Sequence, residues 1–310
     1  MTLEQGLRLI SVELGNRNML RKHTTALLAG SCLMATPALA QDEAPTFFDG
    51  EFSANVAITT DYTFRGVSQT FGDPAIQGGF DWASDLLYVG VWGSTVDFGE
   101  GFTDPFTGES VTDASAELDF YFGVTPSIGD LGLDFGFIYY FYPGAVQDED
   151  DIIVPDTLSV EQQLIADELG VAAGDVLLDN PDQNYIELHA GGSYPVGPAE
   201  VGFNLTYSPD YYFETGDVLI PDVSLSFPLG SAVPFAGSDI SFAFSGNVSY
   251  LEFLDDLVPD GGGFGESYGT YGLGVTATWF GIDLDARWID SFAESGNFGS
   301  TGVFTISKSF

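Results

Sequence analysis

The sequence predicts an all-β fold, a transmembrane up-and-down antiparallel β-barrel of about twelve strands. Three observations support this prediction. The 310 residues include 27 Phe, 14 Tyr and 39 Gly, a composition that favours strands and tight turns over helices. Apolar and polar residues alternate with a period of two along most of the chain. Short and long connections between these segments follow one another alternately along the chain.

Alternation begins at residue 52, and it gives each predicted strand one apolar and one polar face. In this first segment the apolar face carries Phe52, Ala54, Val56, Ile58, Tyr62 and Phe64. The pattern recurs in residues 115–124, 133–141, 201–207, 239–248, 273–279 and 282–288, and more weakly in 76–83, 186–193, 223–227 and 303–310. Residues 87–97 are apolar on both faces, so their phase stays unassigned.

The connections separate a membrane barrel from a soluble sandwich, which also alternates. One set is short: residues 84–86, 126–130, 194–198, 227–238 at the long end, and 280–281. The other set is mostly longer: residues 65–74, 98–113, 143–184, 208–217, 251–267 and 291–299. Short turns at one end and long loops at the other are typical of outer-membrane barrels. An open sheet edge is not tolerated in lipid, so we expect the sheet to close.

The N-terminal residues have the pattern of a secretory leader. Arg21 and Lys22 precede a short apolar run, and Ala38-Leu39-Ala40 is a small-residue cleavage site. We therefore expect a signal peptide at 1–40, with Met19 as an alternative start, then a short segment at 41–50 and a barrel at 51–310. Cys32 is the only cysteine and lies in the leader, which leaves the mature chain without a disulfide or a thiolate site.

The charge balance is strongly acidic, with 46 Asp and Glu against 7 Lys and Arg. Such a chain repels phosphate backbones, so we expect no nucleic-acid partner. Two interpretations of the acidity remain open: a solvated acidic surface, or attraction of cations towards a pore.

Alternation assigns a set of polar side chains to the barrel interior as candidates for selectivity. They are Asp61, Arg65, Asp81, Glu117, Asp119, Asp134, Glu187, His189, Asp239, Asp283, Asp285 and Arg287. Rings of carboxylates favour cations in a confined path. The plainer alternative is that some acids pair with arginine and others face water at the rims. Arg65 itself could bind an inward acid such as Asp61, or form one side of a transverse field across the pore.

Other residues fit the outer wall of such a barrel. Aromatic residues near strand ends suit an interfacial girdle, namely Tyr62, Tyr142, Tyr207, Trp279 and Trp288. Phe304, Ile306 and Phe310 form the alternating C-terminal signal of barrel chains, which Lys308 interrupts at little cost.

Few residues suggest catalysis, metal binding or a cofactor. His189 is the only histidine after the leader and has no evident triad, although Ser193 lies on its face. The run Asp148–Asp151 resembles no EF-hand loop, so we expect a solvated loop, with calcium binding as the lesser alternative. A short helix is predicted at Thr157–Leu169, capped by Asp156 or Thr157. We expect no metal, no cofactor and no enzyme activity.

The segments SANVAITTDYTFRGVSQTFGDPAIQGGFDWA (53–83), YVGVWGSTVDFG (88–99), NYIELHAGGSY (184–194) and the terminal VFTISKSF resemble the TorF-type porins of proteobacteria. The DYTFRGVSQT core is the most specific, and the resemblance covers most of the mature chain. It implies a barrel in the outer membrane of a Gram-negative bacterium, but no established substrate. The acidic segment 147–182 is longer than the resemblance implies, and its role stays open.

The resemblance and the alternation together predict a channel for passive diffusion of small polar solutes, with a preference for cations. Its expected partners are outer-membrane lipid, the solutes and the outer-membrane assembly machinery. Two alternatives remain: a plugged structural or adhesive barrel whose loops bind partners, and a barrel enzyme that acts on lipid.

Overall fold

The computed structural model describes residues 49–98, 114–145, parts of 152–178, 183–235, 238–254, 267–292 and 300–310. The predicted leader and the acidic run 148–151 lie outside the described residues. No helix within the described part of the chain is both long and apolar enough to cross a membrane.

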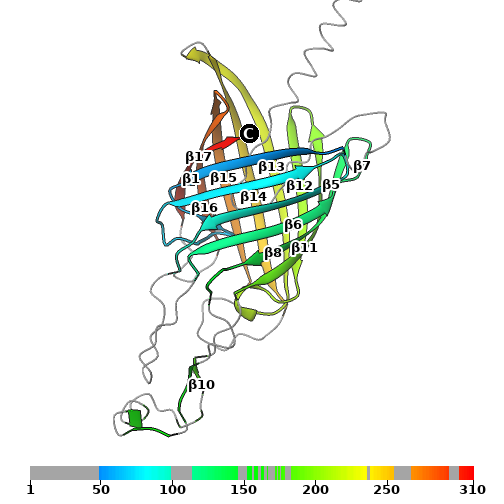
Figure 1. Cartoon of the computed structure of the whole chain (residues 1–310). Coiled ribbons are helices and arrows are strands. Elements are labelled where there is room, and N and C mark those ends of the chain that lie inside the picture. Colours follow the sequence, from blue (N-terminus) through cyan, green and yellow to red (C-terminus); the bar gives the residue numbers. More distant parts are fainter. Residues whose placement is uncertain are drawn as a thin grey trace, which may run out of the picture.

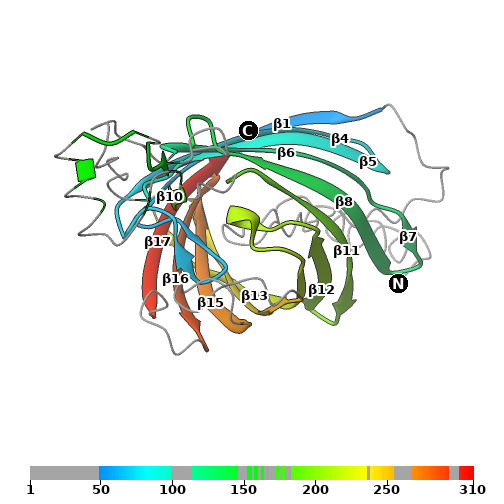
Figure 2. The ribbon, with the colours of Figure 1, turned by 90° about the horizontal axis from the view of Figure 1, so that it is seen from below.

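Twelve strands form one closed antiparallel barrel (Figure 1). They are β1 Glu51–Thr59, β4 Ala75–Ala83, β5 Leu87–Thr95, β6 Ala116–Val124, β8 Leu131–Phe141, β11 Tyr185–Val196, β12 Ala199–Ser208, β13 Val218–Phe235, β14 Ser238–Phe253, β15 Tyr268–Trp279, β16 Ile282–Ser291 and β17 Thr301–Ser309. Each strand pairs with the next one in this order, and β17 pairs with β1, where Ile58 lies opposite Ile306. Viewed along its axis, the sheet forms a ring (Figure 2). The predicted fold class is confirmed.

Short elements belong to the connections between these strands. They are β2 Thr63–Phe64, β3 Val67–Ser68, β7 Ser127–Ile128, β9 Ile152–Ile153, β10 Val176–Leu178 and the 3-10 helix η2 Tyr212–Glu214. In the acidic loop, residues 162, 163 and 166 are helical. Ser159 and Gln162 bond reciprocally to each other's backbone N–H groups, which is a capping box. The predicted cap at Asp156 or Thr157 is therefore wrong, because the helix starts later.

The barrel is apolar outside and polar inside, as the alternation predicts. On β6, Phe120 and Phe122 are 46% and 58% exposed on the outer face, while Glu117 and Asp119 are 1% and 3% exposed on the inner face. Exposure also shows which residues of β5 face outward: Val89 is exposed on the outer face and Tyr88 is buried on the inner face. A soluble barrel has the reverse arrangement, so the outer wall suits an apolar surrounding.

Two aromatic residues of the predicted girdle point into the barrel instead. Tyr62 and Tyr142 are 5% and 2% exposed, and both belong to a buried cluster with Tyr140 and Tyr185. Phe64, also predicted outward, packs against this cluster. The assignment of these three residues to the outer face is wrong, because β1 ends at Thr59 and β8 at Phe141, and the strand alternation does not extend beyond them.

The connection predicted at 227–238 is largely strand. β13 and β14 continue as a hairpin to Phe235 and Ser238, with irregular pairing after Pro228 and after Ala232. The hairpin protrudes from the barrel at the end where the C-terminus lies (Figure 1). This is the short-turn end, and the loop that contains β10 lies at the opposite end.

Candidate functional site

A small hairpin folds into the barrel directly after β1. Phe64 pairs with Val67, which leaves Arg65 and Gly66 as a two-residue turn, both with positive φ, 48° and 80°. This is the geometry of a type I′ turn, in which glycine is favoured. A Cβ on Gly66 would lie 2.8 Å from the Thr270 side chain on β15, so the turn sits tightly against the wall.

Asp61 holds this hairpin (residues 61–70) together from within. Its carboxylate accepts hydrogen bonds from the hydroxyls of Ser68 at 2.6 Å and Thr70 at 3.0 Å, and more weakly from Thr63 at 3.3 Å. Asp61 was predicted to line the pore and offered as a partner of Arg65. It is instead an organising residue of the hairpin, because nearby hydroxyls occupy its oxygens.

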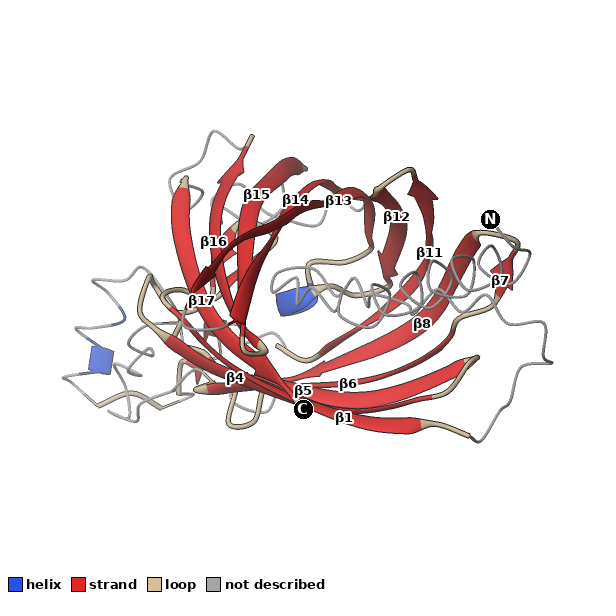
Figure 3. Cartoon of the chain, turned by 90° about the horizontal axis from the view of Figure 1, so that it is seen from above, coloured by secondary structure: helices blue, strands red, loops and turns tan. Residues whose placement is uncertain are grey.

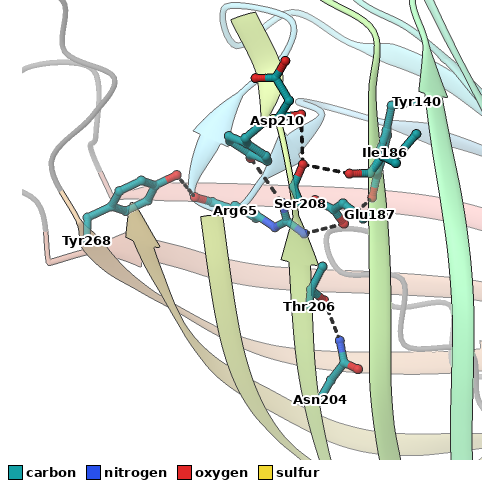
Figure 4. Close-up of polar contacts among 10 residues, drawn as sticks. Arg65, Tyr140, Ile186, Glu187, Asn204, Thr206, Ser208, Asp210 and Tyr268 are labelled. Atoms are coloured by element: carbon teal, nitrogen blue, oxygen red, sulfur yellow. Dashed lines mark hydrogen bonds and ion pairs between the residues drawn. The ribbon is translucent and has the colours of Figure 1, made fainter. Parts of the chain in front are cut away.

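Arg65 at the tip of the hairpin binds the barrel wall (Figure 4). Its guanidinium donates two hydrogen bonds to the carboxylate of Glu187 on β11, the one from Nη2 at 2.8 Å, and a third to the Tyr211 hydroxyl at 3.2 Å. The guanidinium carbon also lies 4.5 Å from the centre of the Phe64 ring. Burial favours the neutral form of Arg65, but the Glu187 carboxylate outweighs it and keeps the pKa of Arg65 above its usual value. The predicted salt bridge thus has Glu187 as its partner.

The hairpin reaches opposite sides of the ring. On one side, the Tyr62 hydroxyl donates to Glu117 of β6 at 2.7 Å, and its ring packs edge-on against Trp92 of β5. On the other side, the Tyr268 hydroxyl of β15 donates to the Arg65 carbonyl at 3.2 Å. Burial, together with the negative Glu117, raises the pKa of Tyr62, so the phenol stays a donor. The hairpin therefore crosses the barrel interior near its long-loop end.

A second inward segment lies beside the hairpin. It is the connection from β12 to β13 with helix η2, which is within the ring in views from both ends (Figures 2 and 3). Tyr211 and Tyr212 pack against Tyr185 with ring centres 5.0 and 6.1 Å apart, and Tyr212 lies 5.4 Å from Tyr142. The long-loop end of the interior is thus filled by aromatic rings around buried carboxylates.

Three of these carboxylates are almost wholly buried: Glu117, Asp119 and Glu187. Among the described residues, Arg65 forms an ion pair with one of them, Glu187. Asp119 Oδ1 has no hydrogen-bond partner within that part of the chain. The described residues include no group of three His, Cys, Asp or Glu side chains arranged to hold a metal ion. This end of the interior is therefore acidic and only partly compensated.

Deeper in the barrel, His189 belongs to a polar cluster. The Tyr88 hydroxyl donates to Asp134 at 3.0 Å and lies 3.2 Å from His189 Nε2, which is 3.4 Å from the same carboxylate. Gly136 leaves room for this cluster, since a Cβ there would lie 2.4 Å from the Tyr88 hydroxyl. These contacts fit a structural or solvated histidine in the interior.

The remaining predicted interior acids are bonded mainly to hydroxyl groups. Tyr121 donates to Asp81, Thr276 to Asp285 at 2.8 Å, and Thr278 to Asp283. These hydroxyl donors are neutral, so they add no positive charge beside the carboxylates.

The second arginine of the interior, Arg287, lies 3.4 Å from Asp285 and donates to Ser245 at 2.8 Å. It extends over Gly274, where a Cβ would lie 2.9 Å from its guanidinium. Asp239 is in β14, but its side chain is outside the described residues.

One interior acid was missed. Asp222 on β13 is buried and accepts a hydrogen bond from Ser249. The strand was predicted to start only at residue 223, because Val218 and Ile220, which share the inner face, are apolar and hide the alternation. The pairing partner β12, with Asn204 and Thr206 on its inner face, is the sequence signal that could have revealed it.

The predicted C-terminal signal lies on the outer wall. Phe304, Ile306 and Phe310 are exposed there, and the Lys308 ammonium lies 5.4 Å from the centre of the Phe310 ring. Tyr207 and Trp279 lie near strand ends on the outer face by alternation, and Trp288 on that face is half exposed.

A family model matches residues 43–208, which include the hairpin, Glu117 and Glu187. The family is described as a bacterial protein family of unknown function, Gcw_chp. The chain belongs to this family. The description gives no activity for the Gcw_chp family, and no curated protein sequence matches the chain significantly.

Solved structures with a similar shape are remote in sequence, and they include a porin and outer membrane channels. LpxR from Salmonella typhimurium is 9% identical with a TM-score of 0.44, over 83% of this chain and 99% of that one. The NanC porin is 8% identical with a TM-score of 0.42, over 83% and 98%. The outer membrane channel DcaP of Acinetobacter baumannii is 9% identical with a TM-score of 0.36, over 84% and 97%. At these values the likeness is one of general barrel shape.

Proposed function

We propose that this member of the Gcw_chp family is a narrow porin-like channel of the Gram-negative outer membrane that passes small polar solutes and prefers cations. The observation that carries the proposal is a closed barrel with an apolar outer wall and an interior lined by carboxylates. Lipid tolerates a sheet only when it has no free edge, and this sheet has none because β17 pairs with β1.

Cation preference follows from the charges that face the interior. Asp81, Asp283 and Asp285 bond to neutral hydroxyls, and Arg287 offsets only part of their charge. Carboxylates in a confined polar path lower the energy of a cation and raise that of an anion. A porin role also agrees with the resemblance to TorF-type porins.

Two measurements on refolded protein test the channel. We expect discrete conductance steps in a planar bilayer and swelling of proteoliposomes in small sugars but not in large ones. A matched pair of variants locates the path: Asp283→Asn with Asp285→Asn alters the inner wall, while Asp130→Asn alters an exposed turn residue. Reduced cation selectivity in the first and none in the second is expected. Equal behaviour of both would place the ion path elsewhere.

A second candidate is a plugged structural barrel, favoured by the two segments folded into the long-loop end. It predicts neither conductance steps nor swelling from protein that is fully folded by gel mobility. A lipid-acting enzyme gains no support from His189, which lies in the interior rather than on the outer wall. Turnover of labelled lipid by the purified barrel would show that this last conclusion is wrong.

A further inference from the structure

The surroundings of Arg65 have the features of a binding site for a guanidinium group. Glu187 offers both oxygens in one plane to two N–H donors, and Tyr211 accepts a third bond. A planar fork of donors facing a carboxylate is the arrangement that guanidinium satisfies best. The Arg65 and Glu187 side chains are 10% and 2% exposed, so the pair is well shielded from water.

The barrel builds this site largely without the hairpin. Glu187 belongs to β11 and receives a further hydrogen bond from Tyr140 of β8 at 3.2 Å. Tyr211 is held by the 5.0 Å ring contact with Tyr185 and by Phe253. These positions do not depend on Arg65 itself, so the site would persist if the arginine side chain left it.

A small cavity with both polar and apolar lining adjoins the site inside the barrel. Its lining includes Arg65, Glu187, Asn204, Thr206, Asp222 and Ser249. Oxygen atoms therefore extend from the guanidinium site towards the deeper interior. A solute that carries a guanidinium or ammonium group would meet the same groups along this route.

The hairpin is bonded internally, and its base is fixed by the Tyr62 bond to Glu117 and by the backbone bond from Asp97 to the Gln69 carbonyl, so a displacement would move its tip. The bonds from Ser68 and Thr70 to Asp61 lie within it and survive a displacement. Beyond the hairpin, Phe71 and Gly72 have positive φ, 51° and 83°, and a Cβ on Gly72 would meet no atom within 4 Å. The polar contacts of its tip with the wall are the Arg65 bonds to Glu187 and Tyr211 and the Tyr268 bond to the Arg65 carbonyl. The Phe64 ring adds an apolar contact, 5.8 Å from the ring of Tyr140.

We propose that Glu187, Tyr211 and Tyr140 form a guanidinium-binding site, and that Arg65 occupies it as a tethered ligand that holds the hairpin across the channel mouth. The solute class that suits the site is then a small molecule with a guanidinium group. The proposal rests on the channel function proposed above.

Removal of the tethered ligand tests the proposal. In a planar bilayer, Arg65→Ala should conduct several-fold more than the unmodified protein, because the tip of the hairpin loses its ion pair with Glu187 and the guanidinium no longer occupies the mouth. Guanidinium chloride should then enter the vacated site and reduce this current, with a half-effect on the order of 1 mM for so small a ligand. Sodium chloride at the same concentration should not. The unmodified protein should respond little, because a tethered group competes at a high effective concentration.

Further variants separate folding from binding. Arg65→Ala leaves Glu187 buried without its partner, so the double variant with Glu187→Gln keeps the test valid if the single one misfolds. The double variant should be open but insensitive to guanidinium. Lys308→Ala removes a positive charge from the outer wall and should behave as the unmodified protein.

Each outcome supports or overturns one statement. Equal conductance of Arg65→Ala and the unmodified channel would show that the hairpin does not restrict the mouth. If Arg65→Ala conducts more but guanidinium reduces its current no more than that of the unmodified protein, the binding site is refuted. Folded protein that never conducts in any variant would refute the channel function itself.

Discussion

Glu117 and Glu187 are buried carboxylates whose bonding explains how the barrel tolerates them. A buried charge costs free energy unless hydrogen bonds or an opposite charge replace water. Glu187 has Arg65 and Tyr140, and Glu117 has the Tyr62 hydroxyl. Alternation predicted that both face inward, but not these partners, because Tyr62 and Arg65 reach them only through the fold of the hairpin.

At the scale of single residues, Tyr62→Phe tests the bond to Glu117. The variant removes the donor at 2.7 Å and leaves a buried acceptor, which costs about 1–3 kcal/mol. We expect a lower unfolding temperature in detergent. Tyr250→Phe is the control, since Tyr250 is an exposed residue of the same type. Equal unfolding temperatures for the two variants would show that the Glu117 bond contributes nothing.

A second pair of variants tests which side chains face lipid and which face the barrel interior. Phe137 is on the outer face of β8 and packs against Phe122, so Phe137→Asp puts a carboxylate against lipid, at a cost of roughly a few kcal/mol near the midplane. Ser241 faces the interior, and Ser241→Asp should assemble normally. The folded fraction is measured by the mobility shift of unboiled samples on a denaturing gel. If both variants assemble equally well, the assignment of outer and inner faces is wrong.

Among the elements, the strands were predictable and the inward segments were not. Period two is a local property, so β6, β8, β12 and β16 could be read directly from the sequence. The β2–β3 hairpin continues the same alternation as β1, and only the turn at Arg65-Gly66 and the bonds to Asp61 redirect it. Such long-range packing leaves no periodic signal. The protruding β13–β14 hairpin was missed because Pro228 and Gly230 suggest a turn.

The β13–β14 hairpin gives a prediction at this scale. The two strands have 18 and 16 residues, more than the roughly 9–11 that a tilted strand needs to cross a membrane. Replacing residues 232–240 by an Asn-Gly turn, which keeps the pair Ser231 and Ser241, should therefore leave the gel shift and the conductance unchanged. Loss of the folded band would show that the extension supports the barrel wall.

At the scale of the whole molecule, the barrel closes where its first strand pairs with its last. The pairing of β1 with β17 removes the last sheet edges, and a closed barrel resists detergent until it is heated. Sequence predicted the strand number and the closure, because connection lengths and backbone chemistry determine both. The state of the mouth could not be predicted, since it depends on two connections packing inside the ring.

Charges on the loop and on the wall should affect ion selectivity over different ranges of salt concentration. Neutralising the run Asp148–Asp151, which lies outside the described residues, should lower cation selectivity only in dilute salt. The reason is that the Debye length falls from ~30 Å at 0.01 M to ~3 Å at 1 M. Neutralising Asp283 and Asp285 on the wall should lower selectivity in both. Selectivity changes of the same size from loop and wall at 1 M would contradict this division.

The sign of the zero-current potential in a potassium chloride gradient tests the central claim most directly. With the unmodified protein in a planar bilayer, the account predicts a potential on the side of the potassium equilibrium potential, in both dilute and concentrated salt. A potential on the chloride side would mean that Arg65 and Arg287 govern the narrowest section, and it would contradict the account of a cation-preferring acidic interior.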